Sequence, residues 1–74
     1  MAMSLRDARV AIVGMGLMGG SLAAALKASQ ACREVIGIAR RANSISMALT
    51  FGFIDRGFLD LAEGVADADL VVLC

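Results

Sequence analysis

The sequence predicts an α/β fold built on a parallel sheet, and two observations carry this prediction. Short apolar segments rich in β-branched residues alternate along the chain with segments of helical composition. Such alternation favours parallel strands joined by right-handed crossovers. Glycines also cluster at positions 14, 16, 19 and 20, directly after the first apolar segment, where the chain would pass from a strand into a helix. The expected order is strand, helix, strand, helix, weak strand, short helix, strand.

The composition excludes several classes of protein. The chain has 74 residues with seven basic and seven acidic side chains; 59% of its residues are hydrophobic and 4% aromatic. A disordered tail needs lower hydrophobicity and a larger net charge, and a nucleic-acid-binding module needs a basic surplus or stacking aromatics. Histidine is absent from the sequence, and Cys32 and Cys74 are too far apart for a zinc or disulfide pattern. We expect free thiols in a reducing compartment, no metal site and no nucleic-acid partner.

The first half of the chain predicts a strand–helix–strand unit. Residues 1–7 lack a clear pattern and are expected to form a frayed leader. Residues 8–13 (ARVAIV) are short, β-branched and stopped by a glycine, which is typical of a strand buried on both faces. Alanine and leucine favour a helix over about residues 17–28, and a second buried strand follows at 34–39 (EVIGIA). The residues expected on the core-facing side of that helix are spaced by four: Met18, Leu22 and Leu26.

A second helix is expected to follow the second strand. Asn43 or Ser44 can cap it, since a short side-chain oxygen accepts hydrogen bonds from the unpaired N–H groups of the first turn. Gly52 is expected to end it. Its predicted apolar face has the i, i+3, i+4 spacing: Ile45, Ala48 and Leu49.

The remaining residues predict a strand, a short helix and a last strand. Residues 53–58 (FIDRGF) form a weak strand or an irregular turn. Asp60 and Glu63 have the spacing of a capping box, which predicts a short helix over 61–66. The chain ends inside the apolar run 70–74 (LVVLC), so we expect it to be the first part of a longer protein. On its own it should be poorly folded or self-associating, because the outer edge of that strand lacks its next neighbour.

One alternative is a targeting or membrane segment. Residues 10–26 carry no charge, contain a run of alanines and follow Arg6 and Arg9, as in a signal peptide. However, about 20 apolar residues are needed to span a bilayer, Asp7 lies in the would-be basic region, and the glycines weaken a helix there. We therefore expect a cytoplasmic protein without a membrane segment.

The glycines match the pattern G-x-G-x-x-G between a predicted strand and a predicted helix, which is typical of a Rossmann-type dinucleotide-binding turn. The first glycine allows a tight turn, the second lets a pyrophosphate lie against the backbone, and the third lets helix and strand pack closely. The N–H groups of Leu17 and Met18 would face the phosphates, aided by the helix dipole. An alternative is that the glycines only tighten the turn. The predicted pyrophosphate site is Gly14, Met15, Gly16, Leu17, Met18 and Gly19.

The end of the second predicted strand indicates which nucleotide fits. NAD-binding sites usually place an acidic residue about 20 positions after the glycines, where it binds the ribose 2′-hydroxyl. Ala39 occupies this position, and Arg40 and Arg41 follow it. A guanidinium matches the oxygens of a 2′-phosphate, and Ser44 could add a contact if it caps the second helix. We therefore expect NADP rather than NAD, the alternative being a solvated basic pair at a strand end.

Several stretches of the sequence resemble the N-terminal part of the prephenate/arogenate dehydrogenases, which are oxidoreductases of tyrosine biosynthesis. The resemblance rests on VAIVGMGLMGGSLAAALK, REVIGIARR, GFIDRG and DLAEGVADADLVVLC, and it covers about residues 8–74. The run Gly19-Gly20-Ser21 and the G-x-I-D-x-G segment at 52–57 are more discriminating than the glycine pattern alone.

The resemblance implies an oxidative decarboxylation, in which a nicotinamide accepts hydride from the ring carbon bearing the 4-hydroxyl while the ring loses carbon dioxide and becomes aromatic. It implies that residues 8–74 are a partial NAD(P)-binding Rossmann domain and that Cys74 borders the cofactor. The catalytic histidine, the domain that binds prephenate or arogenate and the homodimer interface would lie beyond this chain, so no catalytic residue is expected within it. A common family variant has aspartate where Ala39 stands, and this departure favours NADP.

Three other interpretations stay open. The chain could belong to another NADP-dependent reductase of the hydroxyacid or ketopantoate type, or to a non-catalytic nucleotide-sensing Rossmann module. It could also belong to a methyltransferase, because a related glycine loop holds S-adenosylmethionine. Arg40 and Arg41 speak against the methyltransferase, since that ligand has no 2′-phosphate.

Overall fold

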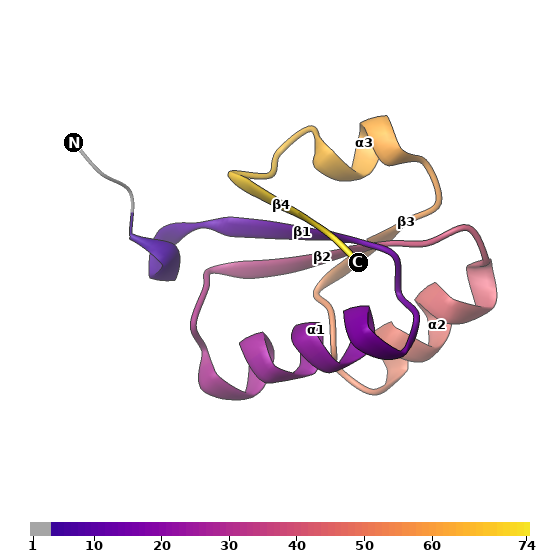
Figure 1. The fold of residues 1–74 in the computed structure, drawn as a ribbon, viewed down its shortest axis with the longest axis horizontal. Helices are drawn as coiled ribbons and strands as arrows, with labels where there is room; N and C mark the ends of the chain where they lie inside the picture. The colour runs from indigo at the N-terminus through magenta and orange to yellow at the C-terminus, as the bar shows by residue number, and fades with distance from the viewer. Residues whose placement is uncertain (1–3) are drawn as a thin grey trace.

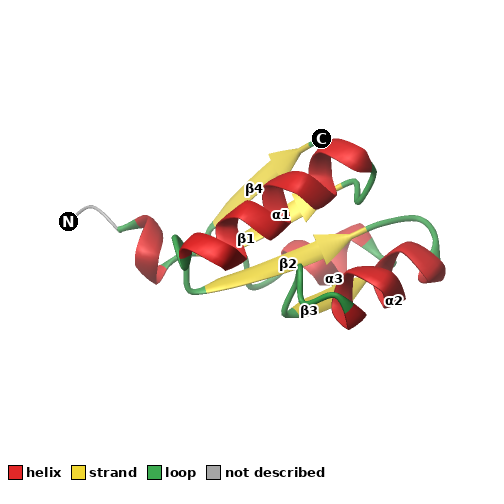
Figure 2. Ribbon diagram, turned by 90° about the horizontal axis from the view of Figure 1, so that it is seen from below, coloured by secondary structure: helices red, strands yellow, loops and turns green. Residues whose placement is uncertain are grey.

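Four parallel strands form one sheet in the computed structural model, which describes residues 4–74. The strands are β1 (Arg9–Val13), β2 (Glu34–Ile38), β3 (Arg56–Phe58) and β4 (Leu70–Leu73). Their order across the sheet is β3-β2-β1-β4, as Figure 2 shows. The chain therefore crosses over after β3, and β4 lies beside β1, as predicted for a Rossmann-type sheet.

Helices cover both faces of the sheet. They are α1 (Leu17–Ser29), α2 (Ala42–Thr50) and α3 (Leu61–Val65), and one turn of 3₁₀ helix (Leu5–Asp7) lies within the segment expected to be a leader. Figure 1 shows α1 and α2 on one face of the sheet and α3 on the other. Within the described chain, none of the helices is long and apolar enough to cross a membrane.

The two layers follow from the alternation of side chains along the strands. Val10 and Ile12 of β1 belong to the core beneath α1 and α2, whereas Ala11 belongs to the core beneath α3. In β2, Val35 faces the first core and Ile36 faces the second. Both central strands are therefore buried on both faces, which confirms the interpretation of their continuous apolar runs.

α1 packs on the sheet through a small side chain. Ala23 is fully buried, whereas Leu22 and Leu26 pack against the same core and stay partly exposed. The helix thus contacts the sheet along a line shifted by one residue from the predicted leucine stripe, because a short side chain at the centre lets the helix axis approach the strands closely. The side chain of Met18, the third predicted member of the stripe, lies outside the described part of the structure.

α2 begins before its predicted caps. Arg41 is its N-cap residue and makes no side-chain cap hydrogen bond. The N–H of Ser44 already donates to the Arg41 carbonyl at 3.1 Å. The prediction that Asn43 or Ser44 caps the helix is therefore wrong, because both residues lie within its first turn.

The buried face of α2 is narrower than predicted. Ile45 and Ala48 are buried, but Leu49 is 44% exposed. The helix rests on β2 and β3 along one line, and Leu49 lies about 100° around the axis from Ala48, away from that contact. Gly52, with a φ of 74°, follows the C-cap residue Phe51 and ends the helix as predicted.

The weaker patterns of the second half are confirmed. The segment FIDRGF contains the short strand β3, and the carboxylate of Asp60 accepts a hydrogen bond from the Glu63 N–H at 2.9 Å. This is the N-cap interaction expected from the spacing of these two residues.

β4 is an edge strand of the described sheet. Its Leu70, Val71 and Leu73 are 46%, 44% and 79% exposed, in contrast to the buried residues of β1. α3 packs mainly against β1, β2 and β3, and these three side chains of β4 remain exposed. Such an edge pairs readily with another chain, and self-association of the 74-residue chain stays a prediction.

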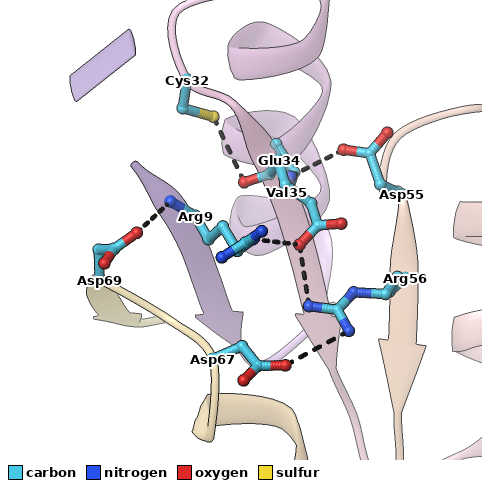
Figure 3. A network of polar contacts seen from close by, with 8 residues as sticks. All are labelled: Arg9, Cys32, Glu34, Val35, Asp55, Arg56, Asp67 and Asp69. Atoms are coloured by element: carbon cyan, nitrogen blue, oxygen red, sulfur yellow. Dashed lines mark hydrogen bonds and ion pairs between the residues drawn. The ribbon is translucent and has the colours of Figure 1, made fainter. Parts of the chain in front are cut away.

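A network of polar contacts joins the strands at their amino ends (Figure 3). Glu34 of β2 accepts a hydrogen bond from Arg56 of β3 at 2.9 Å, and Arg9 of β1 lies 3.5 Å from the same oxygen. Asp67 lies 3.7 Å from Arg56, and Asp69 accepts from the Arg9 N–H at 2.8 Å. Acidic side chains therefore gather at the edge of the sheet opposite the glycine turn.

Asp55 links β2 to α1 at this amino edge. Its carboxylate accepts hydrogen bonds from the Val35 N–H at 2.8 Å and from the Lys27 ammonium. Burial raises the pKa of Asp55, but the hydrogen bonds from Lys27 and Val35 and the charge of Lys27 together lower it below its ordinary value of 3.8. Because the folded pKa lies below the unfolded one, the carboxylate stabilises the fold at neutral pH. This contribution is lost as the pH falls through the folded pKa.

Replacing Asp55 with asparagine is expected to lower the free energy of unfolding by about 1 kcal/mol at pH 7, a value discounted because solvent screens the pair. The difference from the parent protein should shrink as the pH falls below 3.8. Urea unfolding followed by circular dichroism measures both. Asp67→Asn is the control, because Asp67 is 66% exposed and its loss should have little effect. Equal losses in the two variants would contradict the assignment.

Candidate functional site

The glycine turn joins β1 to α1 at the carboxyl edge of the sheet. Gly14 has a φ of 101°, a left-handed conformation that a side chain would strain. Its N–H donates to the Ile38 carbonyl at 2.7 Å, and a Cβ at this position would lie 2.8 Å from the Cys74 carbonyl oxygen. The turn is therefore held between the ends of β2 and β4, where only glycine fits.

Gly19 and Gly16 have separate roles in this turn. A Cβ on Gly19 would overlap the carbonyl oxygen of Gly14 and lie 3.6 Å from the Ile12 side chain, so α1 rests on the turn through a bare backbone. A Cβ on Gly16 would meet no atom within 4 Å. The open space beside Gly16 is a cradle against the backbone, as expected of the second glycine in the pattern.

The start of α1 carries uncompensated positive charge. Gly16 is its N-cap residue and makes no side-chain cap hydrogen bond, and the first turn holds no acidic residue. The backbone of Leu17 and Met18 forms that first turn, whereas their side chains lie outside the described part of the structure. A helix start of this kind attracts an anion through its free N–H groups and its dipole.

Strand pairing brings the other predicted site residues to this turn. Val13 at the end of β1 pairs with Ile38 of β2 on one side and with Leu73 of β4 on the other. The residues that follow these strands therefore lie in a row, with Gly14 between Ala39 and Cys74. Ala39 is partly buried, and its N–H donates to the Phe58 carbonyl at 3.2 Å. In open α/β sheets, ligands bind at the carboxyl edge where the strand order reverses, which here is the boundary of β1 and β4.

Arg40 and Arg41 lie at the same edge and are exposed. Neither guanidinium forms an ion pair within residues 4–74, whereas Arg9 and Arg56 are paired with acidic side chains at the amino edge. The two arginines therefore remain available to an external anion. A pair of free guanidiniums is suited to phosphate oxygens in particular, because each presents a planar fork of donors.

A groove of about 440 Å³ lies between α1 and α2 beside the turn. Its lining is mostly apolar and includes Met15 and Gly16 of the turn and Ser44 of α2. Sequence reasoning missed this groove. The spacing of four between Gly16, Gly20 and Ala24 was the one available indication, because it leaves a bare stripe along α1. Whether such a stripe is open or covered depends on where α2 packs.

The two cysteines are free thiols in different surroundings. Cys74 is exposed beside Gly14, whereas Cys32 is partly buried. Burial, and to a smaller extent the negative charge of Asp55, raises the pKa of the Cys32 thiol above its ordinary value of 9.0. The thiolate is the reactive form, so both burial and protonation disfavour reaction at Cys32.

Iodoacetamide is therefore expected to alkylate Cys74 faster than Cys32 at mildly alkaline pH, because Cys32 is partly buried and the raised pKa of its thiol lowers its thiolate fraction. A time course analysed by peptide mass spectrometry measures the two rates. The same experiment in denaturing urea is the control, because there the two thiols should react alike. Similar rates in the native protein would contradict the difference in their surroundings.

The parallel sheet, the glycine turn and the uncapped start of α1 define a Rossmann-type nucleotide-binding unit, and the solved structures similar to it include dehydrogenases. A prephenate dehydrogenase from A. aeolicus, in complex with hydroxyphenyl propionate and NAD+, is 35% identical over 99% of this chain with a TM-score of 0.81. A prephenate dehydrogenase structure from Aquifex aeolicus is 41% identical over 86% of the chain with a TM-score of 0.77. This chain belongs to the prephenate dehydrogenase family, as its sequence resemblance predicted.

The similarity covers only part of those proteins. The chain spans 24% and 23% of the two prephenate dehydrogenase chains. A scyllo-inositol dehydrogenase from Lactobacillus casei is 21% identical over 97% of this chain and 22% of its own, with a TM-score of 0.71, which shows a shared fold. No protein-family model matches the sequence.

Proposed function

We propose that this chain is the NADP-binding part of a prephenate or arogenate dehydrogenase, which carries out an oxidative decarboxylation in tyrosine biosynthesis. The observation that carries the proposal is the carboxyl edge of the sheet, where Gly16, with open space beside it, follows β1, and the exposed Arg40 and Arg41, which form no ion pair within residues 4–74, follow β2. The similar A. aeolicus structure holds NAD+, which supports a nicotinamide dinucleotide as the ligand.

The residues present fit such a dinucleotide. The cradle beside Gly16 leaves room for a pyrophosphate, and the backbone N–H groups of Leu17 and Met18 would donate to it at the start of α1. Ala39 would lie against the adenosine ribose, and Cys74 would border the cofactor from the end of β4. The bound nicotinamide supplies the chemistry by accepting a hydride; the chain itself binds and orients it.

The proposed preference for NADP rests on two features at the end of β2, namely the small uncharged side chain of Ala39 and the positive charges of Arg40 and Arg41. A carboxylate at position 39 would accept a hydrogen bond from a 2′-hydroxyl and repel a 2′-phosphate. Ala39 removes that repulsion, and the guanidiniums of Arg40 and Arg41 can donate to the phosphate oxygens. Each charge-assisted hydrogen bond contributes roughly 1.5–3 kcal/mol, and about 1.4 kcal/mol corresponds to a tenfold change in affinity. One well-placed arginine is therefore sufficient to set the preference.

The remaining functions are proposed to belong to other parts of the protein. The chain contains no histidine, so the base that takes the 4-hydroxyl proton would be supplied from outside it. The domain that binds prephenate or arogenate and the surface that forms a homodimer would also lie outside it. In this arrangement residues 8–74 contribute the first part of the cofactor domain of a cytoplasmic enzyme.

Steady-state kinetics of the full-length protein test the proposal, with prephenate and arogenate each offered together with NADP+ or NAD+. One of the two substrates should be decarboxylated and oxidised, with kcat/KM at least about tenfold higher for NADP+. Oxidation of a hydroxyacid with no reaction of either substrate would favour the reductase alternative. Binding of NADP without turnover of any of these compounds would favour a nucleotide sensor.

A further inference from the structure

We infer that Ile54 is a positioning residue, which fixes how the glycine turn lies on the sheet and thereby the affinity for the dinucleotide. The inference rests on the proposed function and gives the G-x-I-D-x-G segment at 52–57 a role in it. Ile54 lies between α2 and β3, and its side chain is 4% exposed. It belongs to the core beneath α1 and α2, on the same face of the sheet as the helix that follows the turn.

Two glycines form a seat for this side chain. Gly37 of β2 and Gly57 of β3 are register partners in the sheet. A Cβ on Gly37 would lie 2.8 Å from Ile54 Cδ1 and 3.0 Å from Ile54 Cγ2, and a Cβ on Gly57 would lie 3.3 Å from Ile54 Cδ1. The end of the Ile54 side chain therefore lies against the bare backbone of two neighbouring strands, and a side chain at Gly37 would displace it.

The side chain of Met15 shares the seat on Gly37. Its Sδ would lie 3.0 Å from a Cβ on that glycine, and Met15 is partly buried against the same core as Ile54. Met15 is also the residue between Gly14 and Gly16 in the turn. The space that Ile54 leaves above Gly37 therefore limits how closely the Met15 side chain can approach β2.

The turn is attached to β2 at two adjacent residues. The Gly14 N–H donates to the Ile38 carbonyl at 2.7 Å, and the Met15 side chain lies on Gly37. Gly16, which has the open space proposed for the pyrophosphate, follows directly and is the N-cap residue of α1. Because protein interiors are close-packed, a displaced group moves its neighbours. A change in the seat is therefore transmitted through Met15 to the pyrophosphate position.

The residue after Ile54 holds this side chain in place. The backbone N–H of Asp55 donates to the Val35 carbonyl at 2.8 Å, and its carboxylate accepts from the Val35 N–H at 2.8 Å. The carboxylate also accepts from Lys27 of α1. The segment is thus tied both to β2 and to the helix that the turn begins, so Ile54 has little freedom to move away from the seat.

The test changes the seat by one methyl group at a time. Gly37→Ala adds a carbon, and Ile54→Val removes Cδ1, the atom nearest to it. Isothermal titration of the full-length protein with NADPH and with NADH should show both cofactors weakened by about tenfold in Gly37→Ala, since a small misplacement of a binding group can cost as much as about 100-fold. Both should be affected alike, because the pyrophosphate is common to them.

The double variant tests whether the two residues share one space. Gly37→Ala combined with Ile54→Val should bind both cofactors more tightly than Gly37→Ala alone, because the nearest overlap is removed. Independent residues would instead give additive losses. Ile54→Val by itself should weaken both cofactors by about threefold, because it loosens the support of Met15.

Ile36→Val is the matched control for stability. Ile36 precedes Gly37 in β2, is fully buried and belongs to the core beneath α3. The substitution removes the same methyl group from the other face of the sheet, so it should lower stability without changing either affinity. Circular dichroism identifies a variant that unfolds, and if Gly37→Ala does so, the comparison of Ile54→Val with Ile36→Val decides.

Three results would overturn the inference while the proposed function stands. They are additive losses in the double variant, equal affinities in Ile54→Val and Ile36→Val, and a loss confined to NADPH, which would place the effect at the 2′-phosphate. A parent protein that binds neither NADPH nor NADH would refute the proposed function and the inference together.

Discussion

Gly19→Ala is expected to abolish dinucleotide binding and to lower the free energy of unfolding by about 3 kcal/mol. The new Cβ would overlap the carbonyl oxygen of Gly14 and lie 3.0 Å from its carbonyl carbon. Both atoms belong to the backbone, so a side-chain rotation cannot relieve the overlap. Either the turn opens or α1 moves off β1, and each movement displaces the cradle beside Gly16. Urea unfolding and titration with NADPH measure the two effects.

The neighbouring residue provides a matched control. Gly20→Ala adds the same methyl group one position later in the same helix, where a Cβ meets no atom within 4 Å. Alanine is favoured over glycine inside a helix by about 1 kcal/mol, so this variant should be slightly more stable than the parent. Because Gly20 lines the groove between α1 and α2, it is a control for stability and not for NADPH binding. If Gly19→Ala and Gly20→Ala are equally stable, the close approach at Gly19 does not hold the turn together.

Arg40→Asp is expected to weaken NADPH binding by more than about tenfold and NADH binding little. The substitution removes a charge-assisted hydrogen bond of roughly 1.5–3 kcal/mol, at about 1.4 kcal/mol per tenfold change in affinity, and places a carboxylate that repels the 2′-phosphate. NADH carries only an uncharged 2′-hydroxyl at that position and should lose only the long-range attraction of one positive charge. Isothermal titration with the two reduced cofactors measures the difference.

Arg33→Asp separates the local contact from the change in net charge. Arg33 is exposed and immediately precedes β2, so it lies at the opposite end of the strand from Arg40. It forms no ion pair among residues 4–74, and its substitution changes the net charge by the same amount. A comparable loss of NADPH affinity in Arg33→Asp would mean that net charge, not a contact, explains the effect. Equal losses of NADPH and NADH in Arg40→Asp would refute the 2′-phosphate assignment.

Most of the fold could be predicted because it depends on local chemistry. The apolar run of β1 needs burial on both faces, and Val10, Ala11 and Ile12 are buried as expected. The cap formed by Asp60 and Glu63 depends on residues three apart, so their spacing is sufficient to predict it. The glycine turn could also be predicted from neighbouring residues, because the positive φ of Gly14 belongs to the local conformation of the turn.

The errors arise where distant segments decide the outcome. Leu49 has helical spacing suited to a buried face, yet α2 meets the strands along a line that leaves it exposed. Asn43 and Ser44 are good capping residues, yet the helix begins earlier, where the chain leaves β2. The groove beside Ser44 could not be predicted for the same reason. Its walls belong to α1 and α2, and the distance between two helices does not follow from the sequence pattern of either one.

The sequence alone is sufficient to predict a glycine turn after an apolar strand, two arginines at the end of the next strand and the resemblance to a family. Each of these depends only on residues that are neighbours in the sequence. Only the tertiary structure decides that the turn, the arginines and Cys74 share one edge, that Glu34, Asp55, Asp67 and Asp69 gather at the other, and that Ser44 lines a groove together with Gly16. The physical reason is that strand register and helix packing are set by contacts between segments far apart in the chain.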